Sequence, residues 1–431
     1  LYVLQGNQVN SGTADSTHPT LRADSGWTGT AYTDPRAAAP FAILDTVFRA
    51  KQLILSTAAD TTFPSLSLFW SDENRPSEDR CPDDGNIGTS SYVTFPPAPD
   101  NLDDCMQPQQ SGIYLLGEFV AANADTDEFD QHVVAHEFGH YIEDQFSRSD
   151  SIGGQHGGED LLDLRVAFGE GWGNAVSGMA LQDPVYRDSF QGLSDDFSFN
   201  LESDSQTGQG WFSELSVGEI LWDIFDGANE PGDTVALGFG PIFSVMTGPQ
   251  VTTDALTSVF PFARSIRSNN PSASAAIGTL LAGEAISGTD DFGAGESNAG
   301  TDATVLPVYR DITLNTPLTG ICSRSTAGAL TTNKLGNRRF LRFVNNTTRL
   351  VTITATGAAP NAQSVAATDP DIFVFQRGAF VALGLSEEPG AETIPQFSLP
   401  DGTFIIEVYD FDIEGAVPNS APRCMTVSIQ G

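Results

Sequence analysis

Lysine is almost absent from this chain of 431 residues, which carries it only at Lys51 and Lys334. Lysine and arginine together number 20 against 56 aspartates and glutamates, so the formal net charge is −36. A chain this acidic excludes nucleic acid and anionic membranes as partners, because both require a basic surface. The composition fits either a saline habitat or an ordinary acidic secreted protein.

Long apolar runs are also missing. No stretch approaches the ~18 consecutive apolar residues of a membrane span, so the sequence predicts no transmembrane helix. The length favours two or three domains with ample core. Because the chain begins at Leu1 rather than methionine, we expect a mature form or a fragment from which any signal peptide or pro-segment has been removed.

Cysteine is scarce, and four cysteines allow three pairings. We expect one disulfide between Cys81 and Cys105 and another between Cys322 and Cys424, the alternative being four buried thiols. No Cys-x-x-Cys spacing suggests a metal site. Two disulfides indicate an oxidising compartment, and therefore a secreted protein.

Histidine is rare too, yet three of the five histidines fall in the stretch Asp130–Phe146. An H-E-x-x-H motif begins at His136 and ends at His140. Two residues four apart lie on one face of a helix, about 6 Å apart along its axis. Both imidazoles can therefore reach one ion at about 2.0–2.1 Å, which suits zinc. Glu137 lies beside that face, where a carboxylate can accept and return a proton.

The residues around the motif favour a helix. Val134, Phe138, Tyr141 and Phe146 recur at near-helical spacing on the other side, so they can face a core. Asp130 can cap the start of the helix. His132 lies one turn too early to share the ion easily, so we expect it to support a ligand or to lie at the surface.

A catalytic zinc ion usually has three protein ligands. The first candidate for the third ligand is Glu170, in a glycine-rich segment that permits close backbone approach. Asn174, one turn later, can orient a ligand. The second candidate is Glu159, which lies four residues before Asp163 in a stretch typical of a solvated loop.

The H-E-x-x-H motif followed by Glu170-Gly171-Trp172-Gly173-Asn174 resembles the gluzincin metallopeptidases. Among them it is most similar to the fungalysins, and more distantly to the thermolysin-like enzymes. The resemblance implies an α+β catalytic domain with a sheet lobe, an active-site helix and a mostly helical second lobe. It also implies zinc ligation by His136, His140 and Glu170, with Glu137 as general base.

The sequence departs from this family in two places. Asparagine stands at Asn174, where the family has aspartate. No histidine follows His156, although thermolysin-like enzymes use a late histidine to stabilise the oxyanion. The candidates that remain for this role are Tyr186, His156, Tyr309 and Arg264.

Residues before the boundary that we place near 316 mix helices with a few strands. Strand-like segments cover 65–70 and 112–119, and 71–111 reads as a loop. The segment 112–119 is either an ordinary strand or, as the resemblance implies, an edge strand that pairs with substrate. Helical patterns cover residues 40–55, 164–182, 211–225, 253–268 and 272–286.

After residue 316 the sequence changes to short apolar runs separated by turns. Strands are predicted at 340–344, 351–355, 371–375 and 403–409, which is typical of a β-sandwich. This part resembles the C-terminal β domains of secreted bacterial peptidases. We therefore predict a catalytic domain over 1–315 and an accessory β-sandwich domain over 316–431.

Carboxylates also gather in the run from Asp125 to Asp130. Such runs can bind calcium, a second candidate cofactor beside zinc. The run does not match an EF-hand loop, so helix capping and solvation are the preferred interpretation.

These features predict a secreted zinc-dependent endopeptidase acting on peptide or protein substrates. The alternative is a weak or inactive protein of the same fold with a structural, adhesive or surface-binding role. Glu137 favours the enzyme, because an inactive protein has no chemical need for it. Carbohydrate or surface binding through residues 316–431 is compatible with either.

Overall fold

The computed structural model describes residues 4–6, 10, 12–13, 21–77, 84–94, 110–119, 125–190, 195–203, 207–227, 233–325, 333–357, 368–413 and 421–431. The chain divides into two compact units. Unit 1 comprises Leu1–Tyr141 and Val176–Asn200, and unit 2 comprises Ile142–Ala175 and Leu201–Gly431.

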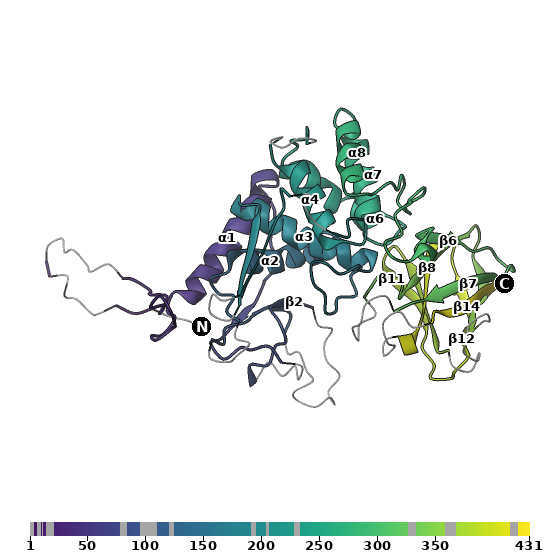
Figure 1. Ribbon diagram of the computed structural model, residues 1–431, viewed down its shortest axis with the longest axis horizontal. Coiled ribbons are helices and arrows are strands. Elements are labelled where there is room, and N and C mark those ends of the chain that lie inside the picture. Colours follow the sequence, from purple (N-terminus) through teal and green to yellow (C-terminus); the bar gives the residue numbers. More distant parts are fainter. Residues whose placement is uncertain are drawn as a thin grey trace. The chain divides into compact units, whose positions relative to one another are not determined.

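Unit 1 contains one long helix before its sheet, α1 (Ala39–Thr57), which confirms the helix predicted over 40–55 (Figure 1). A proline at its first turn starts it, since the fixed φ of proline suits that position. Ile43, Ala50 and Ile54 form its buried stripe at helical spacing. The opposite face leaves Leu44 and Phe48 exposed.

The sheet of unit 1 has the order β1-β3-β2. Its strands are β1 (Leu68–Trp70), β2 (Ser91–Val93) and β3 (Gly112–Leu115). β3 is central among these strands, pairing parallel with β1 and antiparallel with β2, so the interpretation of 112–119 as an edge strand is wrong. All four β3 residues are buried, as expected for a strand covered on both faces. β2 lies inside the stretch predicted as loop.

A β-hairpin that the sequence analysis missed also belongs to unit 1. Its strands are β4 (Val185–Phe190) and β5 (Asp195–Asn200), paired antiparallel. Tyr186 stands opposite Phe199, and their rings stack with centroids 4.8 Å apart. Aromatic pairs across strands stabilise such hairpins.

Two helices, α2 (Gln131–Phe146) and α3 (Leu164–Leu181), contribute residues to both units. Unit 2 continues with α4 (Glu214–Phe225), α5 (Phe239–Met246), α6 (Pro249–Thr252), α7 (Val259–Asn269) and α8 (Ser274–Gly283). α3, α4, α7 and α8 confirm the helical patterns predicted in the middle of the chain, whereas α5 and α6 were not predicted. α3 is buried almost throughout, which explains why its sequence shows small and apolar residues on every side.

The last part of unit 2 consists of two sheets in which most neighbouring strands run antiparallel. The five-stranded sheet has the order β11-β10-β13-β8-β6, and the four-stranded sheet has the order β12-β9-β14-β7. The strands are β6 (Tyr309–Asp311), β7 (Leu318–Ser323), β8 (Arg339–Asn345), β9 (Arg349–Gly357), β10 (Pro370–Gln376), β11 (Ala379–Gly384), β12 (Ala391–Leu399), β13 (Gly402–Asp410) and β14 (Arg423–Gln430).

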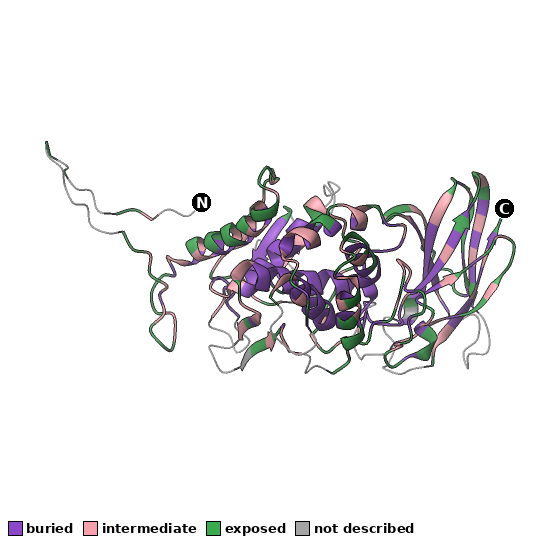
Figure 2. Cartoon of the chain, turned by 90° about the horizontal axis from the view of Figure 1, so that it is seen from above, coloured by how far each residue is buried: buried purple, intermediate pink, exposed green. Residues whose placement is uncertain are grey.

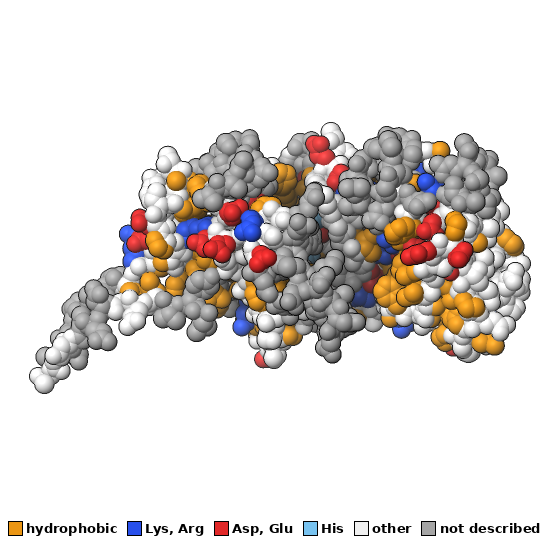
Figure 3. All heavy atoms as spheres, turned by 90° about the horizontal axis from the view of Figure 1, so that it is seen from below, with side chains coloured by type: hydrophobic (Ala, Val, Ile, Leu, Met, Phe, Trp, Pro, Cys, Tyr) orange, Lys and Arg blue, Asp and Glu red, His pale blue; other side chains and the backbone are white. Residues whose placement is uncertain are grey.

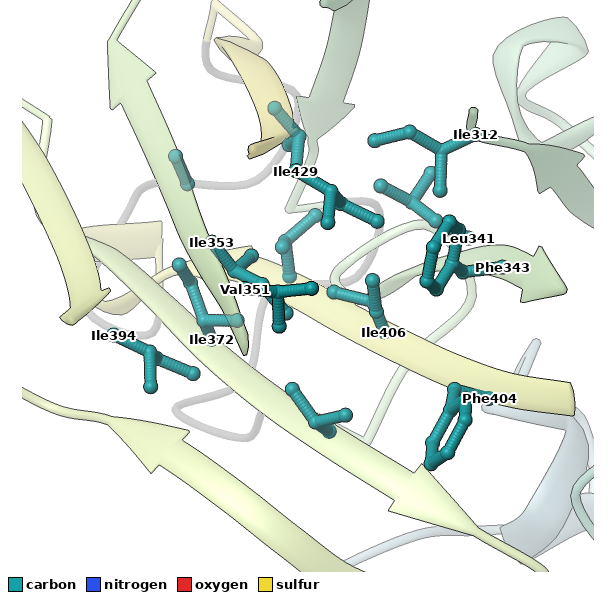
Figure 4. Packing of buried hydrophobic residues seen from close by; sticks show 14 of the residues in the cluster. Ile312, Leu341, Phe343, Val351, Ile353, Ile372, Ile394, Phe404, Ile406 and Ile429 are labelled. Carbon is teal, nitrogen blue, oxygen red and sulfur yellow. The ribbon is translucent and has the colours of Figure 1, made fainter. Parts of the chain in front are cut away.

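A continuous apolar core fills the C-terminal β domain. Val351 and Ile353 of β9 meet Ile372 of β10 and Ile406 of β13 in one buried cluster (Figure 4). Buried and exposed residues alternate along several of these strands (Figure 2), as expected where one face points inward. The four strands predicted after residue 316 are therefore confirmed.

The ends of the β domain are joined covalently. Cys322 of β7 and Cys424 of β14 stand opposite each other and form the predicted disulfide. The other predicted pair, Cys81 with Cys105, lies outside the described residues. β6, which precedes the predicted boundary at 316, pairs with β8 and so belongs to the same sheet.

A buried ion-pair network links α3 to the β domain within unit 2. Arg165 Nη1 donates to Glu407 Oε2 on β13 at 2.7 Å, and Arg165 Nε donates to Asp163 at 2.9 Å. Arg338 pairs with the other oxygen of Glu407. The side chains of Arg165 and Glu407 are each only 1% exposed, so each charge depends on its partners.

The surface of the β domain carries apolar side chains (Figure 3). Two of the exposed ones, Phe380 and Leu383, belong to the edge strand β11. Phe380 and Leu383 are 65% and 53% exposed. Within the described part of the chain, no helix combines the length and apolarity needed to cross a membrane.

The network around Glu407 gives a test of how the β domain is held. Glu407→Gln removes the buried negative charge that pairs with Arg165 and Arg338, so we expect a loss of about 3–5 kcal/mol in the free energy of unfolding. Arg377→Gln is the matched control, because its pair with Asp254 is exposed and is expected to contribute at most about 1 kcal/mol. Urea unfolding measures both. Equal losses in the two variants would contradict the assignment.

Candidate metal centre

The H-E-x-x-H motif lies in the middle of α2, as the sequence predicts. His136 Nε2 and His140 Nε2 are 3.0 Å apart, and the two rings meet edge to face with centroids separated by 4.7 Å. His136 is 8% exposed, and Val134, Phe138 and Tyr141 are buried around it. The helix thus directs two imidazole nitrogens at one point in a largely dry environment.

Glu137 is held by the sheet of unit 1. Its Oε2 accepts a hydrogen bond from the backbone N–H of Tyr92, on β2, at 2.5 Å. The side chain is 7% exposed. A backbone donor fixes the carboxylate without neutralising it, so Glu137 remains able to accept a proton.

His132 lies one turn before the motif and is engaged elsewhere. Its Nδ1 is 3.2 Å from Ser177 Oγ, and its ring centroid is 5.4 Å from that of Tyr186. Burial lowers the pKa of His132 to about 4, so the ring is neutral at physiological pH. Tyr186 also faces His136, with ring centroids 6.1 Å apart.

Glu170 lies in the first half of α3 and is 8% exposed. The next residue, Gly171, allows α4 to approach closely. A Cβ at Gly171 would lie 2.5 Å from Val217 Cβ and 2.7 Å from Glu214 O. α4 begins here because Ser213 caps it, accepting a hydrogen bond from Ser216 N. This contact places Glu214, the first residue of α4, beside Glu170.

His156 completes this group in unit 2. Its Nε2 is 3.3 Å from Glu170 Oε2 and 3.5 Å from Glu214 Oε2, while Nδ1 is 3.0 Å from Gly154 O. Burial alone would lower the pKa of His156, but the two carboxylates outweigh it and raise the pKa to about 10. The ring is therefore held as an imidazolium between two acids.

Side chains just before β8 hold the loop that carries His156. Asn333 Nδ2 donates to Gly153 O at 3.0 Å, and Lys334 Nζ donates to Gln155 O at 2.7 Å. Lys334 also pairs with Asp160 Oδ2 at 2.9 Å and is 2% exposed. One of the two lysines of the chain is thus buried to position this loop.

Three groups of side chains among the described residues each offer ligand atoms within 4.8 Å of one another. They are His136, His140 and Glu170; His156, Glu170 and Glu214; and Asp125, Asp127 and Asp188. The first group is the ligand set expected from the sequence. Glu159, the second candidate, belongs to none of the three and is exposed in a turn.

Two of the four candidates for the oxyanion role are committed elsewhere. The hydroxyl of Tyr309 accepts from Leu256 N, and its ring packs on Phe340 in the β domain. Arg264 forms an exposed pair with Asp291. Tyr186 and His156 remain as candidates. Glu214 was not predicted from the sequence, where the capping serine before it is a signal for a helix start and not for a site.

Residues 104–247 match a family described as the Mycolysin C-terminal domain. The matched segment contains His136, Glu137, His140 and Glu170 and covers less than half of the chain. It supports a peptidase of the mycolysin or thermolysin-like type and associates this protein with secreted peptidases. A search of curated proteins finds no match.

Solved structures that resemble part of the chain include the pre-peptidase C-terminal domain of a collagenase from Bacillus anthracis. That domain is 13% identical, with 28% of this chain and 93% of that one covered, at a TM-score of 0.20. The lysozyme inhibitor PliG of Aeromonas hydrophila is 16% identical, with 28% and 97% covered, at 0.17. The copper-binding protein CorA of Methylomicrobium album BG8 is 10% identical, with 28% and 98% covered, at 0.21. None of these similarities carries an argument at such scores.

The lowered pKa of His132 makes a prediction about acid stability. The unfolded chain protonates this residue near pH 6.5 and the folded chain only near pH 4, so stability falls as the pH drops through this window. At pH 5 the cost is about 2 kcal/mol. His132→Gln, which keeps a polar partner for Ser177, should remove that part of the pH dependence. Urea titrations of the metal-free parent and variant from pH 4 to 7 measure the difference, and parallel curves would refute it.

Proposed function

We propose that this protein is a secreted zinc-dependent endopeptidase. The observation that carries the proposal is the pair of imidazoles on α2, with His136 Nε2 and His140 Nε2 3.0 Å apart beside the carboxylate of Glu137. The match of residues 104–247 to a peptidase-associated family supports the same class.

The donor set suits zinc. In a tetrahedral site with ligands at about 2.0–2.1 Å, neighbouring donor atoms lie roughly 3.3 Å apart, and the separation of the two Nε2 atoms is close to this value at 3.0 Å. Glu170 is the proposed third ligand, since it lies in the glycine-rich segment of α3 that the resemblance assigns to this role. Two nitrogens and one carboxylate oxygen match the ligands of known catalytic zinc sites.

The chain's own groups supply binding and proton transfer. A bound zinc ion would act as a Lewis acid and make water acidic enough to ionise near neutral pH. Glu137, oriented by the N–H of Tyr92, accepts the proton from the attacking water and returns it to the leaving amine. For the oxyanion we propose Tyr186 or His156, which could stabilise it through a hydroxyl or an imidazolium respectively.

Within this class we propose the gluzincin arrangement, with fungalysin-like character. Support comes from the order of His136, His140 and Glu170 along the chain and from the contact of Gly171 with α4. The disulfide between Cys322 and Cys424 fits an oxidising compartment and thus secretion.

Replacing the general base separates metal binding from catalysis. Glu137→Gln keeps the shape of the side chain but accepts no proton, so we expect kcat to fall by about 10²–10⁴-fold. Zinc content should stay at one ion per chain in parent and variant. Cleavage of an unfolded protein substrate, with metal analysis in parallel, measures both. If neither protein cleaves while both hold zinc, the protein has a structural or surface-binding role instead.

The two candidates for the third ligand can be told apart directly. Glu170→Gln should weaken zinc affinity by more than about 100-fold. Loss of a metal ligand should cost more than loss of a residue that hydrogen-bonds to a ligand, which typically lowers metal affinity about 10–100-fold. Glu159→Gln is the matched control, and its affinity should equal that of the parent. Competition with a chromogenic chelator gives both values. The reverse ranking would make Glu159 the ligand.

A further inference from the structure

A second set of buried acidic residues lies in unit 1, apart from the imidazole pair. Asp125 and Asp127 come from the segment before α2, and Asp188 comes from β4. One carboxylate oxygen of each lies within 4.8 Å of those of the other two. The proposed peptidase mechanism uses none of these residues.

The oxygens of this cluster are unusually poorly satisfied. Asp127 is 2% exposed and Asp125 is 8% exposed. In each of the three residues Oδ1 is buried and has no hydrogen-bond partner. The other oxygen of Asp127 accepts from Ser90 Oγ, which itself accepts from Leu116 N, so the carboxylate is fixed in place. An unsatisfied buried carboxylate oxygen is costly, and each of the three residues contains one.

No cation of the described chain compensates them. The charged groups that act on the three residues are further carboxylates, including Asp130, and the buried Arg36 is bound to Glu128. Among the described residues, the charges that act most strongly on this cluster are therefore negative.

We propose that Asp125, Asp127 and Asp188 bind a divalent cation of the calcium class, which ties the segment before α2 to the β4–β5 hairpin. Three carboxylates without a nitrogen or sulfur donor favour a hard ion such as Ca²⁺ over zinc. The helix-capping interpretation of this run is thereby restricted to Asp130, which directly precedes α2 and whose Oδ2 accepts from Ser189 N and Oγ.

The position of the site gives the cation a structural task. Asp188 lies two residues after Tyr186, whose ring contacts both His132 and His136. A cation shared by Asp125, Asp127 and Asp188 fixes the hairpin against the start of α2 and so keeps Tyr186 beside the imidazole pair. This inference concerns a second metal site and does not depend on peptidase activity.

The test is calcium binding by the full chain, desalted and reloaded with one equivalent of zinc. Calorimetric titration with CaCl₂ should give one site per chain, and calcium should raise the midpoint of thermal unfolding. Asp127→Asn and Asp188→Asn should each weaken calcium binding at least tenfold and reduce that thermal shift. Asp60→Asn, in an exposed acidic residue outside the cluster, is the matched control and should bind as the parent does.

The outcomes distinguish the site from a protonated acid cluster. Loss of calcium binding in both cluster variants but not in Asp60→Asn supports the proposal, whether or not the protein cleaves peptides. Calcium binding that is unchanged in Asp127→Asn and Asp188→Asn would overturn it, since the ion would then bind elsewhere. Absence of any binding at millimolar CaCl₂ would overturn it equally. The zinc content of each variant, measured in the same samples, shows whether the proposed zinc site is still occupied.

Discussion

A buried carboxylate requires a compensating positive charge or a full set of hydrogen bonds, and this chain has few cations to provide. It has 56 acidic residues and 20 lysines and arginines. In the described part of the molecule, several of these cations pair with deeply buried carboxylates. Arg36 meets Glu128, and Arg165 joins Glu407 between α3 and β13. Even Lys334, one of two lysines, is buried beside Asp160.

The small number of lysines and arginines also bears on both proposed metal sites. Around Glu170 the positive charge comes from His156, held as an imidazolium by Glu170 and Glu214. At Asp125, Asp127 and Asp188 three unsatisfied carboxylate oxygens are buried, and the cation proposed for this cluster would compensate their charge. Under both proposals, metal ions would add positive charge where the chain's own cations are few.

Local patterns made much of this structure predictable. The H-E-x-x-H spacing predicted the helix, the shared direction of His136 and His140, and a buried far side. Short apolar runs separated by turns predicted four of the C-terminal strands, and the cysteines predicted their disulfide. Gly171 was expected at a close backbone approach, and α4 makes that approach.

What could not be predicted depends on contacts between distant segments. Glu214 meets His156 only because α4 packs on Gly171. β3 is central because β2 pairs along one of its sides. β2 was not predicted, since it forms within a stretch whose glycines, prolines and aspartates indicate a loop. The acidic run that begins at Asp125 was interpreted as a solvated helix cap. The sequence alone does not show that Asp188 lies close to it in the fold.

The ligands at the imidazole pair can be measured directly by zinc K-edge X-ray absorption on the purified chain, compared with Glu170→Gln. We expect two imidazole nitrogens and a carboxylate oxygen at about 2.0–2.1 Å in the parent, with the carboxylate contribution lost in the variant. A spectrum without imidazole, or one that is unchanged in Glu170→Gln, would contradict this ligand set.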